Sequence, residues 1–167
     1  MARNLPGNRR DGVAGEWAAG GGKLLSAGGA AGRIVVMIEY GGFSYPTLSP
    51  YVFYEDLAGA LAFLAAAFGF TERLRNENPD GSLSHCEMAA GDSVIMLGTP
   101  PDYRNPAHSG SITVGMHVHV DDVDAHYARA IAAGATAQGA PVDQSYGVRS
   151  YGALDPEGHQ WWFAQPI

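Results

Sequence analysis

Hydrophobic residues recur at two spacings along this chain: every second position in short runs, and every third or fourth position in two longer runs. The first helical run follows Asp56, a residue type that caps helix N-termini, and it ends at Gly69. The second follows Asp122 and ends at Gly134. Each predicted helix has one apolar face for the core. These faces consist of Leu57, Leu61, Leu64 and Phe68 in the first helix and of Val123, Tyr127 and Ile131 in the second.

The alternating runs predict one strand before each helix and three strands after it. They lie at residues 48–54, 70–76, 83–89 and 93–98 in the first half, and at 111–120, 135–138, 147–154 and 159–165 in the second. The second half therefore repeats the plan of the first. We call residues 45–98 module one and residues 111–167 module two. The repeat predicts an α+β fold in which two paired βαβββ modules form a cupped mixed sheet with helices on its outer face.

The N-terminal segment, residues 1–44, has a different character. It holds 11 of the 23 glycines and shows no sustained hydrophobic period, so we predict a flexible extension that precedes one folded domain of residues 45–167. Met37 lies just before the predicted domain. One hypothesis is that Met37 is the natural start and that residues 1–36 are a leader outside the native protein.

Charge is divided unevenly between these two parts. Residues 1–44 carry five Lys/Arg and three Asp/Glu, which leaves five Lys/Arg and fourteen Asp/Glu for residues 45–167, a net charge of −9. Such an acidic body disfavours nucleic acid and favours a neutral or cationic ligand. No apolar run is long enough to span a membrane, and Cys86, the single cysteine, excludes an intrachain disulfide. We expect a cytoplasmic protein.

Strand alternation assigns side chains to the two faces of the predicted sheet. In the strand that begins module two, Met116 and Val118 face the helices, whereas His117 and His119 face the concave side, which we call the cup. A cup lined by aromatic and apolar residues with a few polar groups is typical of a small-molecule pocket. A second apolar core or a dimer interface would use the same residues. The cup-facing residues are Tyr51, Phe53, His85, Glu87, Met96, His117, His119 and Trp162.

Six short motifs follow one another along residues 45–167: Pro50-Tyr-Val-Phe-Tyr-Glu-Asp56, Ala67-Phe-Gly-Phe70, Gly81-Ser-Leu-Ser-His-Cys-Glu-Met88, Val94-Ile-Met-Leu-Gly98, Val120-Asp-Asp-Val-Asp124 and Asp155-Pro-Glu-Gly-His-Gln-Trp161. In their order and spacing they resemble the vicinal oxygen chelate superfamily, which includes glyoxalases, extradiol dioxygenases, and bleomycin- and fosfomycin-resistance proteins. The resemblance covers residues 45–167 and implies paired βαβββ modules, usually in a homodimer.

The resemblance also assigns the family's metal-ligating positions, which fall here on Ser49, Met96, Gly115 and Trp162. Glycine and tryptophan offer no metal ligand, and a neutral hydroxyl and a thioether are poor ligands for a hard divalent ion. The resemblance therefore implies the metal-site-lacking branch, similar to proteins that sequester a drug. We expect no cofactor and a small, aromatic or cationic ligand. The predicted ligand-binding residues are Tyr51, Phe53, Met96, His117, His119, Arg149 and Trp162.

An enzymatic function is the alternative: a lyase, isomerase or dioxygenase. It would use a metal relocated to His117, His119 and Glu87, or an acid–base pair made of His85 and Glu87. Arg149 has two interpretations, a clamp for a ligand carboxylate or an ion pair with a local carboxylate such as Asp143. The sequence leaves open the identity of the ligand, and whether the cup forms within one chain or across two.

Overall fold

The structure, a computed structural model, describes residues 23–28 and 34–167. In that part of the chain no helix is long and apolar enough to cross a membrane. Module one contains β4 (Tyr51–Phe53), α1 (Leu57–Phe63), the π-helical segment η1 (Leu64–Phe68), β5 (Thr71–Glu77), β6 (Leu83–Ala90) and β7 (Ser93–Gly98). The short helix α2 (Pro106–Ser109) lies in the linker. Module two contains β8 (Gly115–His119), α3 (Val123–Ala132), β9 (Thr136–Ala137), β10 (Val142–Gln144), β11 (Val148–Leu154) and β12 (Gln160–Pro166).

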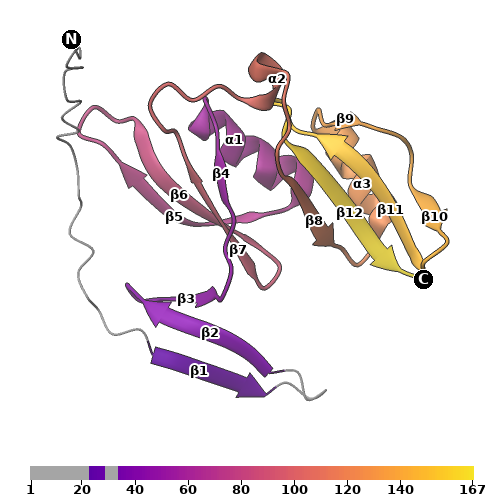
Figure 1. Cartoon of the computed structure of the whole chain (residues 1–167), viewed down its shortest axis with the longest axis horizontal. Helices are drawn as coiled ribbons and strands as arrows, with labels where there is room; N and C mark the ends of the chain where they lie inside the picture. The colour runs from indigo at the N-terminus through magenta and orange to yellow at the C-terminus, as the bar shows by residue number, and fades with distance from the viewer. Residues whose placement is uncertain (1–22, 29–33) are drawn as a thin grey trace, which may run out of the picture.

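The two modules have the same strand order. The sheet of module one runs β4-β7-β6-β5, and that of module two runs β8-β12-β11-β10, with β9 paired to β11. The strand before the helix pairs in parallel with the final strand of its module, β4 with β7 and β8 with β12. The other neighbouring strands are antiparallel. The predicted α+β fold with two βαβββ modules and mixed sheets is confirmed, and the two sheets lie side by side in Figure 1.

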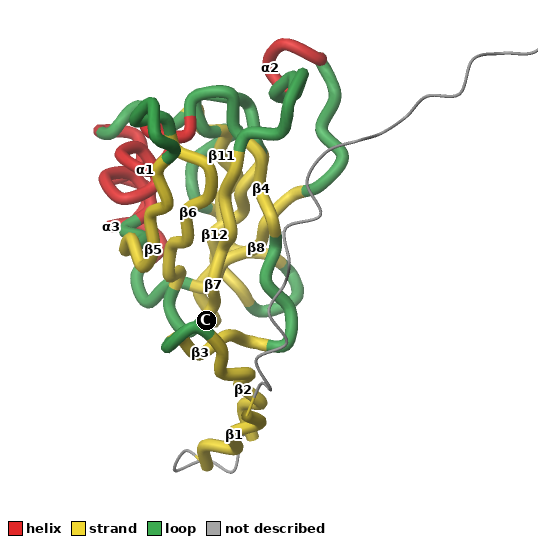
Figure 2. The backbone as a smooth tube through the Cα atoms, turned by 90° about the vertical axis from the view of Figure 1, so that its left-hand side faces the viewer, coloured by secondary structure: helices red, strands yellow, loops and turns green. Residues whose placement is uncertain are grey.

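The helices form as their capping residues predict. The side chain of Asp56 accepts a hydrogen bond from the Gly59 amide, and Asp122 accepts one from the Ala125 amide, both at 2.9 Å. Gly69 ends η1 in the left-handed conformation, with a φ of 72°. Figure 2 shows α1 and α3 on the same side of the sheets. Their apolar faces bury the core between helices and sheets and leave the opposite sheet faces free for a site.

The buried face of α3 differs from the prediction. Val123 is buried as expected, but Ile131 is exposed, and His126, which is not on the predicted apolar face, is buried. The Nδ1 atom of His126 lies 2.7 Å from the Tyr151 hydroxyl, and its Nε2 atom lies 3.3 Å from the carbonyl oxygen of Phe68. Burial, with a contribution from a neighbouring arginine, lowers the pKa of His126 to about 4. A hydrogen-bond partner for each ring nitrogen lowers the free-energy cost of burying this histidine. Because these partners are distant in the sequence, hydrophobic periodicity does not reveal them.

The N-terminal segment also differs from the prediction. Its described residues form β1 (Lys23–Gly28), β2 (Ile34–Tyr40) and β3 (Phe43–Pro46), which pair as a separate antiparallel sheet (Figure 1). The sequence predicted flexibility because glycine dominates the segment, yet the apolar run of β2 supplies a strand that pairs on both edges. The rest of the predicted flexible segment and leader, residues 1–22 and 29–33, lies outside the described residues.

Candidate functional site

The cup face of module one is built by strand register. Tyr51 on β4 pairs with Met96 on β7, and Met96 pairs with Glu87 on β6, so these three side chains cross the sheet in one row. Tyr51 is exposed and Met96 is half-buried, whereas Glu87 is only 2% exposed. On the other face of β6, Cys86 and Met88 are buried in the core. The alternation therefore places all three residues on the face that the sequence predicted.

A chain of hydrogen bonds runs across this face. The Tyr51 hydroxyl lies 2.7 Å from Nδ1 of His85, and Nε2 of His85 lies 3.2 Å from Oε1 of Glu87. With its proton on Nε2, the neutral imidazole of His85 donates to Glu87, and Nδ1 accepts the hydrogen bond from the Tyr51 hydroxyl. Burial, together with the neighbouring Cys86 and Glu87, raises the pKa of Tyr51, so its phenol stays protonated. The structure thus brings the predicted His85–Glu87 pair together and links it to a tyrosine.

Tyr45, which the sequence did not single out, completes the chain. It lies on β3, is buried, and donates from its hydroxyl to Oε1 of Glu87 at 2.9 Å. Oε2 of the same carboxylate is buried and has no hydrogen-bond partner in residues 23–28 and 34–167. The only sequence signal for Tyr45 was its place at the predicted start of order.

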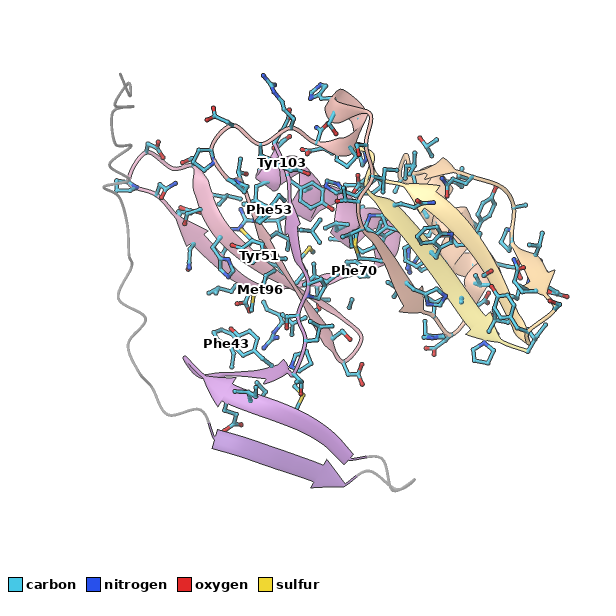
Figure 3. All side chains as sticks on the ribbon, viewed as in Figure 1. Phe43, Tyr51, Phe53, Phe70, Met96 and Tyr103 are labelled. Atoms are coloured by element: carbon cyan, nitrogen blue, oxygen red, sulfur yellow. The ribbon has the colours of Figure 1, made fainter. Side chains whose placement is uncertain are left out.

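A cleft of about 360 Å³ opens at one end of this row, between β4 and the segment that leads into β8. The rings of Tyr51, Phe53 and Tyr103 form one wall, with centroids 5.1 Å apart for the first pair and 5.8 Å for the second. Figure 3 shows these three residues and Met96 following one another along module one, with Phe43 of β3 beyond them. The remaining lining consists of Pro50, Val52, Arg104, Pro106, Ser109, Ser111, Ile112, Thr113, Val114, Met116 and His159.

The cup face of module two is an open surface. Trp162 is 37% exposed, and its indole lies so close over Gly115 that a Cβ on that glycine would overlap the ring. His117 and His119 are also exposed, with ring centroids 5.1 Å apart. None of Trp162, His117 and His119 is among the residues that line the cleft. The structure therefore places the predicted ligand-binding residues in two groups, one in each module.

The family's metal does not fit the four positions that the resemblance assigns to it. Gly115 has no side chain, and the ring of Trp162 fills the space that a side chain there would occupy. The Ser49 hydroxyl is buried without a hydrogen-bond partner among the described residues, and Met96 offers only a thioether. A serine hydroxyl and a thioether make a weak set for a divalent ion.

The relocated metal site is not assembled in this chain either. In the described part of the chain no three His, Cys, Asp or Glu side chains lie close enough together to hold a metal ion. His117 and His119 belong to β8, whereas Glu87 lies in the other sheet and is engaged with His85 and Tyr45. These three residues therefore do not form a common site within one chain.

Arg149 lies outside the cup. Its Nε and Nη2 atoms donate to the carboxylate of Asp124 on α3, at 2.9 and 3.0 Å, and its Nη1 atom donates to Asp143 at 2.8 Å. These hydrogen bonds with two carboxylates raise the pKa of the guanidinium. This geometry agrees with the interpretation of Arg149 as an ion-pair residue. It does not agree with a clamp for a ligand carboxylate, because Nε, Nη1 and Nη2 already donate to Asp124 and Asp143.

A second buried carboxylate, Asp155, begins the turn before β12. Its Oδ2 atom accepts from the Tyr54 hydroxyl at 2.8 Å and from Nε1 of Trp161 at 3.1 Å. Its Oδ1 atom accepts from the amides of Glu157 and His159, at 3.1 and 2.9 Å. Burial alone would raise the pKa of Asp155, but the hydrogen bonds from His159, Trp161 and Tyr54 outweigh it and hold the pKa below its ordinary value. This network fixes the turn before β12.

Comparisons with known proteins agree with the fold. An uncharacterized protein from Mycobacterium bovis is 36% identical over 128 residues, which cover 73% of this chain and 84% of the relative. The crystal structure of TioX from Micromonospora sp. ML1 is 30% identical, with a TM-score of 0.59 over 72% of this chain and 95% of TioX. That of a glyoxalase/bleomycin resistance protein/dioxygenase family enzyme from Burkholderia phytofirmans PsJN is 26% identical, with a TM-score of 0.56 over 70% and 95%. A sequence model of the same family matches residues 46–163, so the chain belongs to the Glyoxalase/Bleomycin resistance protein/Dioxygenase superfamily.

Proposed function

We propose that this protein binds a small aromatic or cationic molecule and does so without the superfamily's standard metal. The observation that carries the proposal is the cleft beside β4. Its volume of about 360 Å³ lies within the range of ~300–1,000 Å³ that is typical of small-molecule sites. Its wall of Tyr51, Phe53 and Tyr103 offers ring faces for stacking and for a cation.

The acidic body supports a cationic ligand. Residues 45–167 carry a net charge of −9, and such a field raises the local concentration of cations. Trp162 provides a second, exposed ring on module two. We expect the protein to be cytoplasmic and to form a homodimer.

Metal-free acid–base catalysis is the second candidate, and the hydrogen-bond chain from Tyr51 through His85 to Glu87 favours it. A carboxylate that orients an imidazole, which in turn accepts a proton from a hydroxyl, is a common arrangement for proton transfer. Tyr51 ends this chain at the wall of the cleft, where a substrate would lie. Such a site would suit a lyase or an isomerase of the superfamily.

The first experiment is an elemental analysis of the untagged protein, before and after exposure to Zn, Mn, Fe, Ni and Co. We expect only trace metal. Near-stoichiometric metal that is lost when His117 and His119 are replaced would contradict the proposal and would direct attention to metal-dependent enzymes of the superfamily.

The second experiment is a thermal-shift screen with aromatic amines and neutral aromatic compounds. We expect ligands that raise the melting temperature of the wild type to lose this effect in Tyr51→Ala. The matched control is Tyr146→Ala, which removes an equally large but 74% exposed ring outside the cleft and should leave the shifts unchanged. Equal loss in both variants would argue against the cleft.

A further inference from the structure

Among the described residues, the buried carboxylate of Glu87 has no permanently charged positive partner. Its Oε1 atom accepts from Tyr45 and lies next to His85, whose charge depends on its protonation, and its Oε2 atom has no hydrogen-bond partner in that part of the chain. Within residues 23–28 and 34–167, no lysine or arginine forms an ion pair with Glu87. An ionised carboxylate that is buried without a cation is strongly disfavoured, so this position is suited to a positively charged group.

The groups around Glu87 are those that recognise a protonated amine. Tyr51 and Met96 lie beside it in the same row of the sheet, and Tyr45 covers it from β3. Aromatic faces attract an ammonium group, and the thioether of methionine packs well against an apolar stem. Because Tyr51 also lines the cleft, the row connects the cleft to the carboxylate.

In the part of the chain that the structure describes, strand β3, which carries Tyr45 over Glu87, is not hydrogen-bonded to the backbone of the sheet beneath it. β3 pairs with β2 and with no strand of the module-one sheet. Side chains attach it instead: Tyr45 bonds to Glu87, Arg73 donates to the carbonyl oxygen of Ser44 at 3.0 Å, and the Arg73 guanidinium lies over the rings of Phe43 and Tyr45 at 5.4 and 5.2 Å. β3 can therefore move away without breaking a single strand pair of module one.

We propose that Glu87 anchors the protonated amine of a small ligand and that Tyr45 covers this anchor until the ligand displaces it. The inference rests on the proposed binding function and deepens it by naming the charged group of the ligand. The amine donates to the free Oε2 atom, its apolar stem lies along Met96, and its aromatic part extends past Tyr51 into the cleft. The cover explains why a residue outside the family match, which begins at residue 46, reaches into the site.

The test uses the full-length chain and two probes of the same shape, 2-phenylethylammonium and neutral 2-phenylethanol, measured by isothermal titration calorimetry. We expect the wild type to bind the ammonium about tenfold more tightly than the alcohol. In Glu87→Gln this preference should disappear. Glu77→Gln is the matched control because it removes an exposed carboxylate from the neighbouring strand β5 and changes the net charge by the same amount.

Tyr45→Phe tests the cover. It removes the hydrogen bond that holds β3 over Glu87 but keeps the ring. The cover should therefore open at a lower cost, and we expect a several-fold tighter binding of 2-phenylethylammonium than in the wild type. Unchanged or weaker binding in Tyr45→Phe would show that Tyr45 does not cover the anchor.

The remaining outcomes separate this inference from the function on which it rests. Equal binding of the two probes by the wild type, or a charge preference that survives Glu87→Gln, would overturn the anchor while leaving a binding cleft in place. Failure of both probes to bind the wild type and Tyr45→Phe would also overturn the anchor. The proposal that the cleft binds the ligand is contradicted only if Tyr51→Ala and Tyr146→Ala lose the ligand-induced shift in melting temperature equally.

Discussion

Two carboxylates are buried among the residues that the structure describes, Glu87 in module one and Asp155 in module two, and they differ in how many hydrogen bonds they accept. Both oxygens of Asp155 accept hydrogen bonds, from Tyr54, Trp161 and two backbone amides. Glu87 is as deeply buried, but one of its oxygens has no partner among the described residues. A buried carboxylate whose two oxygens both accept hydrogen bonds stabilises the fold. A buried carboxylate with an unpaired oxygen can still accept a hydrogen bond from a ligand. The same duplicated fold thus carries one acid that is fully hydrogen-bonded within the protein and one for which we propose a binding role.

The largest expected effect comes from removing the satisfied acid. Asp155→Ala leaves two buried side-chain donors and two amides without an acceptor, so we expect the free energy of unfolding to fall by about 4 kcal/mol. Urea denaturation, extrapolated linearly to water, measures the change. Glu87→Gln is the comparison, and we expect it to remain within about 1 kcal/mol of the wild type because it also removes an unpaired buried charge. A similar loss in the free energy of unfolding in Asp155→Ala and Glu87→Gln would contradict the distinction between the two carboxylates.

A pH series separates the contribution of Asp155 to stability from that of the buried imidazole of His126. The pKa of His126 is about 4 in the folded protein and about 6.5 in the unfolded chain, so the unfolded chain binds more protons between these values. Stability should therefore fall as the pH falls, by about 2 kcal/mol between pH 7 and pH 5. Asp155, whose pKa is lowered, loses its contribution only at more acidic pH.

His126→Gln checks this assignment, because an amide can still bond to Tyr151 and Phe68 but does not titrate. We expect the fall in stability between pH 7 and pH 5 to be mostly absent in this variant. A fall of the same size in the variant and the wild type would assign the pH dependence to other groups.

The smallest effects come from a pair of tyrosine variants, one for each acid. Tyr54→Phe removes a buried donor to Asp155, and we expect a loss of about 1.5 kcal/mol in the free energy of unfolding. Tyr45→Phe removes the corresponding donor to Glu87, but water can replace it once β3 moves, so we expect less than about 1 kcal/mol. Thermal and urea unfolding of both variants decide the comparison. A larger loss in Tyr45→Phe would mean that β3 is an integral part of the fold.

Much of the fold could be predicted because local signals and periodicity agree. Asp56 and Asp122 cap their helices, Gly69 ends η1, and the alternation in β6 and β12 assigns core and cup faces as the structure has them. These features depend on neighbours in the sequence. His126 could not be assigned in this way, because its partners Tyr151 and Phe68 are distant in the chain.

The site was predicted less completely for the same reason. Tyr51, His85 and Glu87 could be placed on one face by strand period, but the contact of Tyr45 with Glu87 depends on how a separate sheet docks. Tyr103 lines the cleft from the linker between the modules, where no hydrophobic periodicity indicates which way a side chain points. For Arg149 the sequence offered Asp143 as an ion-pair partner, and Asp143 pairs with it across β10 and β11. The contact with Asp124 depends on the packing of α3 against β11 and could not be predicted from the sequence.

The end of the first helix makes the two modules unequal. Two carbonyl groups at the C-terminus of η1, those of Ala67 and Phe68, lie within hydrogen-bonding distance of Arg129 and His126 of α3. Both helices end at a glycine turn of their own, at Gly69 and at Gly134, but the last two carbonyl groups of η1 also have side-chain partners in module two. A gene that encoded only the first repeat would leave these two carbonyl groups without those partners, so the two repeats are no longer interchangeable.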